Sequence, residues 1–230
     1  MPLLAKDIAQ MIDLSCVRTW SNRADIEEMV SAANRFGFGQ VSVLQCYIPY
    51  TRQLLIGSNV RIVGNVSFPS GSDSTSVKVR QAQEMIAAGC NEIDMVMNIG
   101  ELKSGEFTEV ESDVMAVARE VNPLPLKVII EIMYLLPEET EEACRICVDS
   151  GATFVKTGTG WADRGTTLDD VKLVKSFVND QIKIKASGGI RNLETLLEMY
   201  RAGASRFGVN LKSGIEIIQQ AAQFPEGIDI

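Results

Sequence analysis

The chain alternates short runs of β-branched and other apolar residues with longer amphipathic stretches, from one end to the other. Short apolar runs are typical of buried strands, whereas apolar residues three and four positions apart are typical of helices that pack on one face. A glycine repeatedly ends an amphipathic stretch and directly precedes an apolar run, as a helix C-cap followed by a strand does. This imperfect repeat occurs at residues 87–90, 150–153 and 202–205.

Eight strands follow from these junctions and from the remaining apolar runs. The predicted strands are residues 11–15, 40–44, 61–66, 92–98, 127–133, 153–157, 183–187 and 206–210. Several of the intervening helices have a recognisable N-cap, a residue whose side chain accepts a hydrogen bond from the first turn. The predicted caps are Ser21 or Asn22 for a helix that runs to residue 34, Thr75 for one to residue 88, Thr167 with Asp170 for one to residue 178, and Asn192 for one to residue 202.

The number of strand–helix units decides between two α/β architectures. Nothing in the chain resembles an interdomain linker, so residues 1–230 are expected to form one domain. Eight units favour a single-domain (β/α)₈ barrel, the TIM barrel, over an open doubly wound sheet, in which about six strands are usual. In such a barrel the active site lies at the C-terminal ends of the strands.

Side-chain alternation predicts which strand residues point into the barrel. In the strand 183–187, Ile184 and Ala186 suit the side that faces the helices, which leaves Lys185 pointing inward. Asp94 points inward by the same rule in the strand 92–98. Four further charged residues are expected to lie deeper, as a structural charge layer and not as catalysts. They are Glu92, Lys127, Lys183 and Arg206.

Composition and charge narrow the class of protein. The chain has 230 residues, 46% of them hydrophobic, which allows one large core. A formal net charge of -8 argues against nucleic acid as the main partner, while a local basic pocket for one phosphate stays compatible with it. The first seven residues lack the long apolar core of a signal peptide, and no uncharged apolar run approaches a membrane span. We therefore expect a cytoplasmic protein with no membrane partner.

The five cysteines do not predict a disulfide framework, because their number is odd and the chain is long for one. Cys144 and Cys147 match a C-x-x-C pattern inside the helical stretch 138–150, with no second pair and no histidine in the chain. A packed or partly exposed pair of reduced thiols is favoured there over metal binding or redox chemistry.

Two lysines at the ends of neighbouring predicted strands carry the main chemical signal. Lys156 and Lys185 occur in apolar strand patterns, in a chain that has no histidine. Desolvating one ammonium is costly, and placing two together is worse unless one of them loses its proton. A free lysine titrates near 10.4, so substantial neutrality near pH 7 needs a drop of about 3 pKa units, on the order of 4 kcal/mol. A neutral lysine is an amine nucleophile, which indicates carbonyl chemistry.

Seven stretches in order along the chain carry a resemblance to a known family. They are residues 12–15, 68–71, 92–100, 102–105, 126–131, 154–160 and 185–191. Together they resemble the deoxyribose-phosphate aldolases, class I enzymes that use a lysine Schiff base, and the likeness covers almost the whole chain. The resemblance implies that Lys156 forms the Schiff base, Asp94 serves in proton transfer and Lys185 is the second active-site lysine. It implies no metal and no cofactor, since the imine itself is the electron sink.

The resemblance also implies a supporting network and a phosphate site. Asp13 and Thr159 match positions in the polar network around the lysines, with a helix or turn cap as an equal alternative for Asp13. For Asp94, a buried salt-bridge partner without chemistry is the alternative. Glycine-rich loops after the last strands suit a phosphate, because their backbone N–H groups face the anion. The expected substrate- and phosphate-binding residues are Gly160, Gly188, Gly189, Gly208, Asn210 and Ser213.

The sequence departs from the family's pattern in the loop after the last strand. Two adjacent serines are usual there, but Asn210 and Leu211 occupy those positions, unless two inserted residues let Ser213 and Gly214 open the final helix. Gly158 and Trp161 are further departures around the substrate's tail. The expected reaction is reversible cleavage of 2-deoxyribose 5-phosphate to glyceraldehyde 3-phosphate and acetaldehyde. A different phosphorylated or unphosphorylated aldol, and a sugar-phosphate-binding barrel without catalysis, are the alternatives, and a homodimer or higher homo-oligomer is compatible with the fold.

Overall fold

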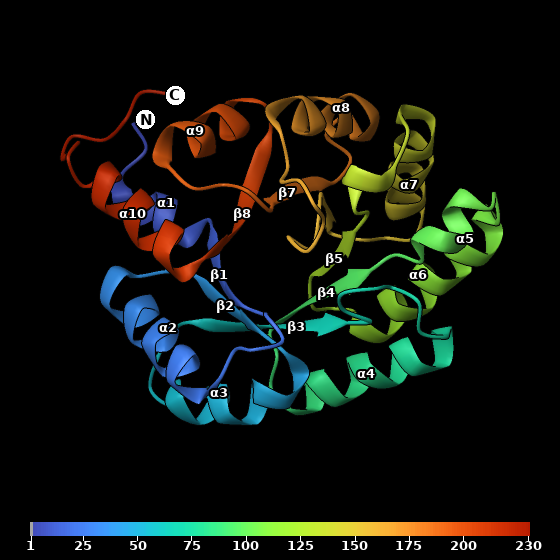
Figure 1. The fold of residues 1–230 in the computed structure, drawn as a ribbon, viewed down its shortest axis with the longest axis horizontal. Coiled ribbons are helices and arrows are strands. Elements are labelled where there is room, and N and C mark those ends of the chain that lie inside the picture. The colour runs from blue at the N-terminus through green and yellow to red at the C-terminus, as the bar shows by residue number, and fades with distance from the viewer. Residues whose placement is uncertain (1) are drawn as a thin grey trace.

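The protein folds as a closed barrel of eight parallel strands in sequence order, surrounded by helices (Figure 1). The structure is a computed structural model, and it describes residues 2–230. The strands are β1 Ile12–Cys16, β2 Gln40–Val43, β3 Arg61–Val66, β4 Glu92–Val96, β5 Leu126–Ile129, β6 Phe154–Lys156, β7 Lys183–Ser187 and β8 Ala204–Asn210. The predicted (β/α)₈ TIM barrel is therefore confirmed.

Helices cover the outside of the barrel, and most of them follow a strand directly. The helices are α1 Ala5–Gln10, α2 Arg23–Phe36, α3 Ile48–Leu54, α4 Thr75–Ala87, α5 Ile99–Lys103, α6 Phe107–Val121, α7 Pro137–Asp149, α8 Leu168–Val178, α9 Leu193–Arg201 and α10 Leu211–Ala221, with 3₁₀ turns η1 Gln45–Tyr47 and η2 Ile132–Tyr134. The short α1 lies beside α10, and Leu3 forms a bridge with Ile228, so the two ends of the chain meet (Figure 1). Within residues 2–230 no helix has the length and apolar character to cross a membrane.

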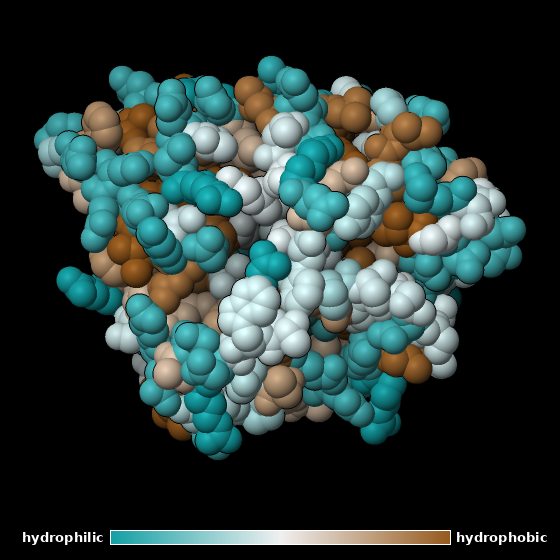
Figure 2. All heavy atoms as spheres, in the orientation of Figure 1, coloured by the Kyte–Doolittle hydropathy of each residue, from teal (hydrophilic) through white to brown (hydrophobic). Residues whose placement is uncertain are grey.

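The apolar core lies between the strands and the helices. Strand residues that face outward, such as Ile62, Met95 and Val155, are fully buried there. Inward-facing neighbours on the same strands are mostly polar or charged, so the barrel's interior carries the chemistry. On the face in Figure 2, hydrophilic side chains surround the edge and hydrophobic ones occur in separate groups.

The predicted strands match the observed ones closely, except after β5. The strand predicted for residues 127–133 ends at Ile129. Glu131 adopts a left-handed backbone conformation with φ of +44°, and η2 begins at the next residue. A left-handed residue breaks the strand geometry, which a β-branched and apolar sequence does not reveal.

Most predicted helix caps are confirmed. Asn22 and Asn192 accept hydrogen bonds from the first turns of α2 and α9, and Thr167 forms a capping box with Asp170 at the start of α8. The prediction of Thr75 is wrong by one position, because Ser74 is the N-cap of α4 and Thr75 is its first helical residue.

A bulge between β7 and β8 fixes which side chains of β8 face inward. Ile184 pairs with Ala204, but Lys185 pairs with Arg206, so Ser205 has no partner of its own in β7. One extra residue on one strand reverses the alternation beyond it. Arg206 and Gly208 therefore face the interior, while Phe207 is fully buried in the outer core.

Replacing Thr167 by alanine should destabilise the protein through loss of the α8 cap. The lost side-chain bond is worth about 1 kcal/mol, which corresponds to a melting temperature lower by about 2–4 °C for a domain of this size. Thr108→Ala is the matched control, since Thr108 is exposed in α6 and is not its N-cap. Thermal unfolding followed by circular dichroism measures both variants. Equal melting temperatures for the two would contradict the role of the capping box.

Candidate active site

The three residues predicted to be catalytic meet inside the barrel. Lys156 ends β6 and is the register partner of Lys185 on β7, while Asp94 lies on β4. Asp94 Oδ2 accepts hydrogen bonds from Lys156 Nζ at 2.7 Å and from Lys185 Nζ at 2.8 Å. Each of the three residues has at most 5% of its surface exposed. One carboxylate oxygen therefore holds both lysines.

The second oxygen of Asp94 is also occupied. Lys127 Nζ on β5 donates to Asp94 Oδ1 at 3.0 Å and lies 2.6 Å from Glu92 Oε2. The sequence placed Lys127 in a structural layer below the site, but the structure shows it in direct contact with the central carboxylate. Lys127 is fully buried, so this contact is not weakened by solvent.

Asp13 on β1 is an ion-pair partner and not a cap. Its Oδ2 accepts a hydrogen bond from Lys185 Nζ at 2.5 Å, and its Oδ1 accepts one from Arg206 Nη1 at 3.1 Å. Lys185 is thus held between two carboxylates, Asp13 and Asp94. The alternative that Asp13 serves as a turn or helix cap is wrong.

Cations outnumber carboxylates in the cluster around the central carboxylate. Asp13, Glu92 and Asp94 are buried and face the three buried lysines Lys127, Lys156 and Lys185. Asp13 and Glu92 also pair with arginines that reach towards solvent, Arg206 and Arg61. Because an uncompensated buried charge is costly, loss of a proton from one lysine reduces the excess of positive charge.

The pKa directions identify Lys156 as that amine. Burial is the main cause that lowers the pKa of Lys156 to about 8; Asp94 opposes the shift, and the charges of Lys185 and Lys127 add to it. Burial acts the same way on Lys185, but Asp13 and Asp94 outweigh it and raise its pKa above the ordinary value. Burial also disfavours ionised Asp94, yet Lys127, Lys156 and Lys185 together hold its pKa well below its usual range. Lys156 is the amine that deprotonates first.

Two adjoining cavities lie next to the lysines. The smaller one, about 20 Å³, is bordered by Lys156, Lys185 and Thr159 and has room for roughly one water. The larger one is about 260 Å³. Thr159 and Gly208 border both, so a ligand whose reacting carbon lies at Lys156 would extend into the larger cavity.

Gly208 leaves room for Ser187, two residues after Lys185, where β8 passes β7. A Cβ at this position would lie 2.5 Å from Ser187 Oγ and 3.6 Å from Lys185 Cε. The first distance is shorter than any side chain tolerates, so a larger residue would displace the neighbours of the lysine.

Glycine loops after β6 and β7 form one wall of the larger cavity. Gly160, Gly188 and Gly189 border it and all have positive φ, of +79°, +100° and +81°. A Cβ on Gly188 would lie 3.4 Å from Gly160 Cα, so the two loops touch through their backbones. The positive φ of the three residues is what requires glycine here.

The segment after β8 offers less to a ligand than the sequence suggested. Asn210 borders the larger cavity, but its Oδ1 accepts from Ser213 N at 2.9 Å and caps α10. Ser213 is 5% exposed in the first turn of α10 and is not among the residues that border the cavity. The alternative that Ser213 and Gly214 open the final helix is wrong, because α10 begins at Leu211.

Thr159 is fixed by a carboxylate that the sequence did not single out. Glu131 is 4% exposed and accepts from Thr159 N at 3.0 Å and from Thr159 Oγ1 at 2.5 Å. Gly158 makes room for this pair, since a Cβ there would lie 2.8 Å from Glu131 Oε1. The left-handed conformation of Glu131 thus aims its side chain at the loop that follows Lys156.

Aromatic side chains and an arginine border the mouth of the larger cavity. Trp161 packs edge-on against Phe68, with ring centres 6.2 Å apart. The Arg18 guanidinium lies over Trp161 and Trp20, and its Nη2 donates to Gly160 O at 2.8 Å. The indole N–H of Trp161 is buried with no acceptor among residues 2–230. Segments after β1, β3 and β6 therefore meet at this mouth.

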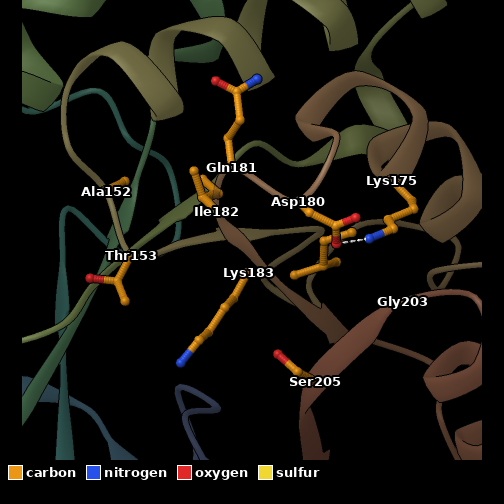
Figure 3. A pocket seen from close by; sticks show the side chains of 10 residues that line it. Ala152, Thr153, Lys175, Asp180, Gln181, Ile182, Lys183, Gly203 and Ser205 are labelled. Atoms are coloured by element: carbon orange, nitrogen blue, oxygen red, sulfur yellow. Dashed lines mark hydrogen bonds and ion pairs between the residues drawn. The ribbon is translucent and has the colours of Figure 1, made fainter.

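A third cavity, about 460 Å³, lies at the opposite end of the barrel, around the first residues of β6, β7 and β8 (Figure 3). Lys183 borders it, exposed, with its ammonium 5.7 Å from the centre of the Phe154 ring. Lys175 pairs with Asp180 beside it. The sequence placed Lys183 in the buried charge layer, but the structure shows it exposed and outside the network of Asp94 and Asp13.

Comparison with known proteins agrees with this geometry. Residues 14–216 match the family model described as DeoC/LacD family aldolase. The chain belongs to this aldolase family. The class I mechanism, with a lysine Schiff base, follows from membership of the family.

Relatives of the DeoC/LacD family match nearly the whole chain. The deoxyribose-phosphate aldolase of Rhizobium meliloti (strain 1021) is 40% identical over 226 residues, which cover 98% of this chain and 91% of that protein. The protein of the same name from Mannheimia succiniciproducens is 42% identical over 214 residues, 93% of this chain and 95% of that protein. Among solved structures, an aldolase called QR15 superposes with a TM-score of 0.89 at 38% identity, over 95% of this chain and 97% of that one.

Removing the charge of Lys127 should shift the pH at which aldolase activity rises to a higher value. The Lys127 charge lowers the pKa of Lys156, so Lys127→Met should raise that pKa above its value of about 8. Each unit of rise reduces the neutral fraction of the amine at pH 7 by about tenfold. A profile of kcat/KM between pH 6 and 10 measures the shift, and Lys127→Arg, which keeps the charge, should shift it less.

Lys78→Met is the matched control for this variant. Lys78 is also fully buried, on α4, and pairs with Asp113 at 2.5 Å outside the barrel. Its loss should lower stability by a comparable amount without moving the pH profile. If both variants kept the wild-type profile, Lys127 would have a structural role alone.

Proposed function

We propose that this chain is a deoxyribose-phosphate aldolase that cleaves 2-deoxyribose 5-phosphate reversibly to glyceraldehyde 3-phosphate and acetaldehyde. The observation that carries the proposal is Lys156, a buried lysine whose pKa is lowered to about 8 beside a small cavity. At that pKa about a tenth of the amine is neutral at pH 7, and about half at pH 8. The names and near-complete coverage of the relatives support the substrate.

In the first step the neutral amine of Lys156 attacks the C1 aldehyde of the open-chain sugar and forms a carbinolamine. The carbinolamine then loses its hydroxyl as water, which requires a proton. Lys185 is suited to donate it, because its raised pKa keeps it charged at neutral pH. The product is an iminium ion on Lys156, and its positive charge lies beside Asp94 Oδ2 in place of the ammonium it replaced.

In the second step the C3 hydroxyl gives its proton to Lys185, which lost its own in the first step and borders the same small cavity, and the C2–C3 bond breaks. The bonding electrons move into the iminium and form an enamine, while C3 leaves as the aldehyde of glyceraldehyde 3-phosphate. Protonation of the enamine at C2 and hydrolysis release acetaldehyde and regenerate the amine. Asp94 is the carboxylate at the centre of these transfers. Its strongly lowered pKa keeps Asp94 ionised in the resting site, so it orients the lysines between which protons move by accepting their hydrogen bonds.

The remaining positions divide between supporting the lysines and holding the substrate's tail. Asp13 fixes Lys185, and Thr159 borders both cavities in a position set by Glu131. The glycine loops and Gly208 would receive the phosphate through backbone N–H groups. The partners proposed are thus an aldehyde and a sugar phosphate; cytoplasmic location and a homo-oligomeric state stay predictions.

A second candidate substrate, another phosphorylated or unphosphorylated aldol, is favoured by one observation. Asn210 uses its side-chain oxygen as a helix cap, and Leu211 is apolar, so the segment after β8 lacks the pair of hydroxyls usual in the family. Initial rates on a panel of aldols separate the two candidates. Turnover of another aldol together with failure on deoxyribose phosphate would favour the second.

Borohydride should trap an adduct on Lys156 in the presence of 2-deoxyribose 5-phosphate or acetaldehyde. Reduction of the iminium gives a stable secondary amine, which peptide mass mapping locates on one lysine. Lys156→Ala should lose activity by at least about 10³-fold, because Lys185, the other lysine that borders the small cavity, has a raised pKa that keeps it charged. Lys183→Ala is the control, since Lys183 lies at the opposite end of the barrel and should be dispensable. A fully active Lys156→Ala enzyme without an adduct would refute the mechanism.

A further inference from the structure

Arg18 is a charged residue at the mouth of the larger cavity to which the proposed chemistry gives no role. It lies in the segment between β1 and α2 and borders the cavity. Its guanidinium carbon is 5.3 Å from the ring centre of Trp161 and 5.9 Å from that of Trp20. Its Nη2 donates to Gly160 O. The guanidinium is therefore held in place by two indoles and one carbonyl.

These contacts position the charge of Arg18 without neutralising it. Within residues 2–230, no carboxylate lies within ion-pairing distance of Arg18, whereas Arg164 on the same cavity pairs with Asp170 at 2.6 Å. Arg191 also borders the cavity without an ion pair, but its exposed guanidinium has no hydrogen bond or aromatic contact among the described residues that would fix it. Asp163 also borders the cavity, and like Arg18 it is exposed, but it forms no ion pair with Arg18. In a chain with a net charge of -8, such a cation is a local attractive point for an anion. Its planar set of N–H donors suits the oxygens of a phosphate.

The neighbouring segment, after β8, provides little that could share this task. The side-chain oxygen of Asn210 is already bound to Ser213 N, and Leu211 has no polar side chain. The glycine loops can bind any small anion through their backbone N–H groups, but these groups carry no net charge. Recognition of charge at this end of the cavity therefore falls to the arginines at its rim. Arg18 is the one fixed to the β6 loop, close to Gly160.

We propose that Arg18 is the specificity-determining residue for the negatively charged tail of the substrate. The inference rests on the proposed aldolase function and adds how this chain distinguishes a phosphorylated aldol from an unphosphorylated one. Discrimination is supplied by the segment after β1, through its contact with Gly160, and not by the segment after β8. The phosphate of a bound substrate would accept hydrogen bonds from the N–H groups of Arg18 that have no partner, while the two indoles keep the guanidinium plane in place.

The test compares kcat/KM for 2-deoxyribose 5-phosphate with kcat/KM for 2-deoxyribose. In Arg18→Met, which keeps the stem and removes the charge, the ratio of the two values should fall by about 10- to 100-fold. The loss should lie in KM for the phosphorylated sugar. Arg18→Lys should recover part of the ratio, because it restores the charge without the planar donors. The wild-type ratio should itself decrease as salt is added.

Arg23→Met is the matched control, since Arg23 is an exposed arginine that stacks on Tyr50 at 4.7 Å and does not border the cavity. It removes the same net charge, and its ratio should stay within about twofold of the wild type. An Arg18→Met ratio equal to that of Arg23→Met overturns the proposal, as does a wild type with no preference for the phosphorylated sugar.

Failure of the aldolase assignment gives a different result. If wild type cleaves neither sugar, the proposed function fails, and calorimetric titration with inorganic phosphate then tests Arg18 directly. Phosphate should bind at least about tenfold more weakly to Arg18→Met than to Arg23→Met. Equal binding to both variants overturns the role of Arg18.

Discussion

One oxygen atom, Oδ2 of Asp94, constrains the whole interior of the barrel. It accepts hydrogen bonds from two lysines, while Lys127 occupies the other oxygen of the same carboxylate. Asp94 therefore cannot fully compensate a third positive charge. Because solvent is excluded, the imbalance is relieved most easily by loss of a proton, and burial selects Lys156 for it. Reactivity follows from how the charges inside the barrel are balanced.

The same constraint gives the two lysines different properties although they are neighbours in register. Lys185 has a second carboxylate, Asp13, which Arg206 holds in place. Lys156 has Asp94 alone, although both lysines border the small cavity. One lysine is thus kept as an acid and the other as a nucleophile, in a chain without histidine. The apolar residues that point outward on the same strands form the core under the helices. The outer face of the sheet therefore stabilises the fold, and the inner face carries the catalytic groups.

Local rules were sufficient for the barrel and for the centre of the site. The glycine junctions, the capping box of Thr167 and strand alternation depend on neighbouring residues, so one sequence reveals them. Contacts between distant segments were not accessible in this way. The approach of Lys127 to Asp94, the bond between Glu131 and Thr159, and the stacking of Arg18 on Trp161 join residues 33, 28 and 143 positions apart. The left-handed conformation of Glu131 was missed for a related reason, since it is favoured by the contact that its side chain makes with the loop after the neighbouring strand, β6.

The unpaired Ser205 at the junction of β7 and β8 has a consequence for how this chain can change. Ser205 has no partner in β7, and this extra residue determines which side chains of β8 point into the barrel. Deleting one residue there would exchange the inward-facing and outward-facing side chains of the strand. Phe207 and Val209 would enter the charged interior, and Arg206 would be forced among the apolar helices. Substitutions can adjust this strand one side chain at a time, whereas a change of length cannot. The last strand of the barrel should therefore tolerate substitutions better than insertions or deletions.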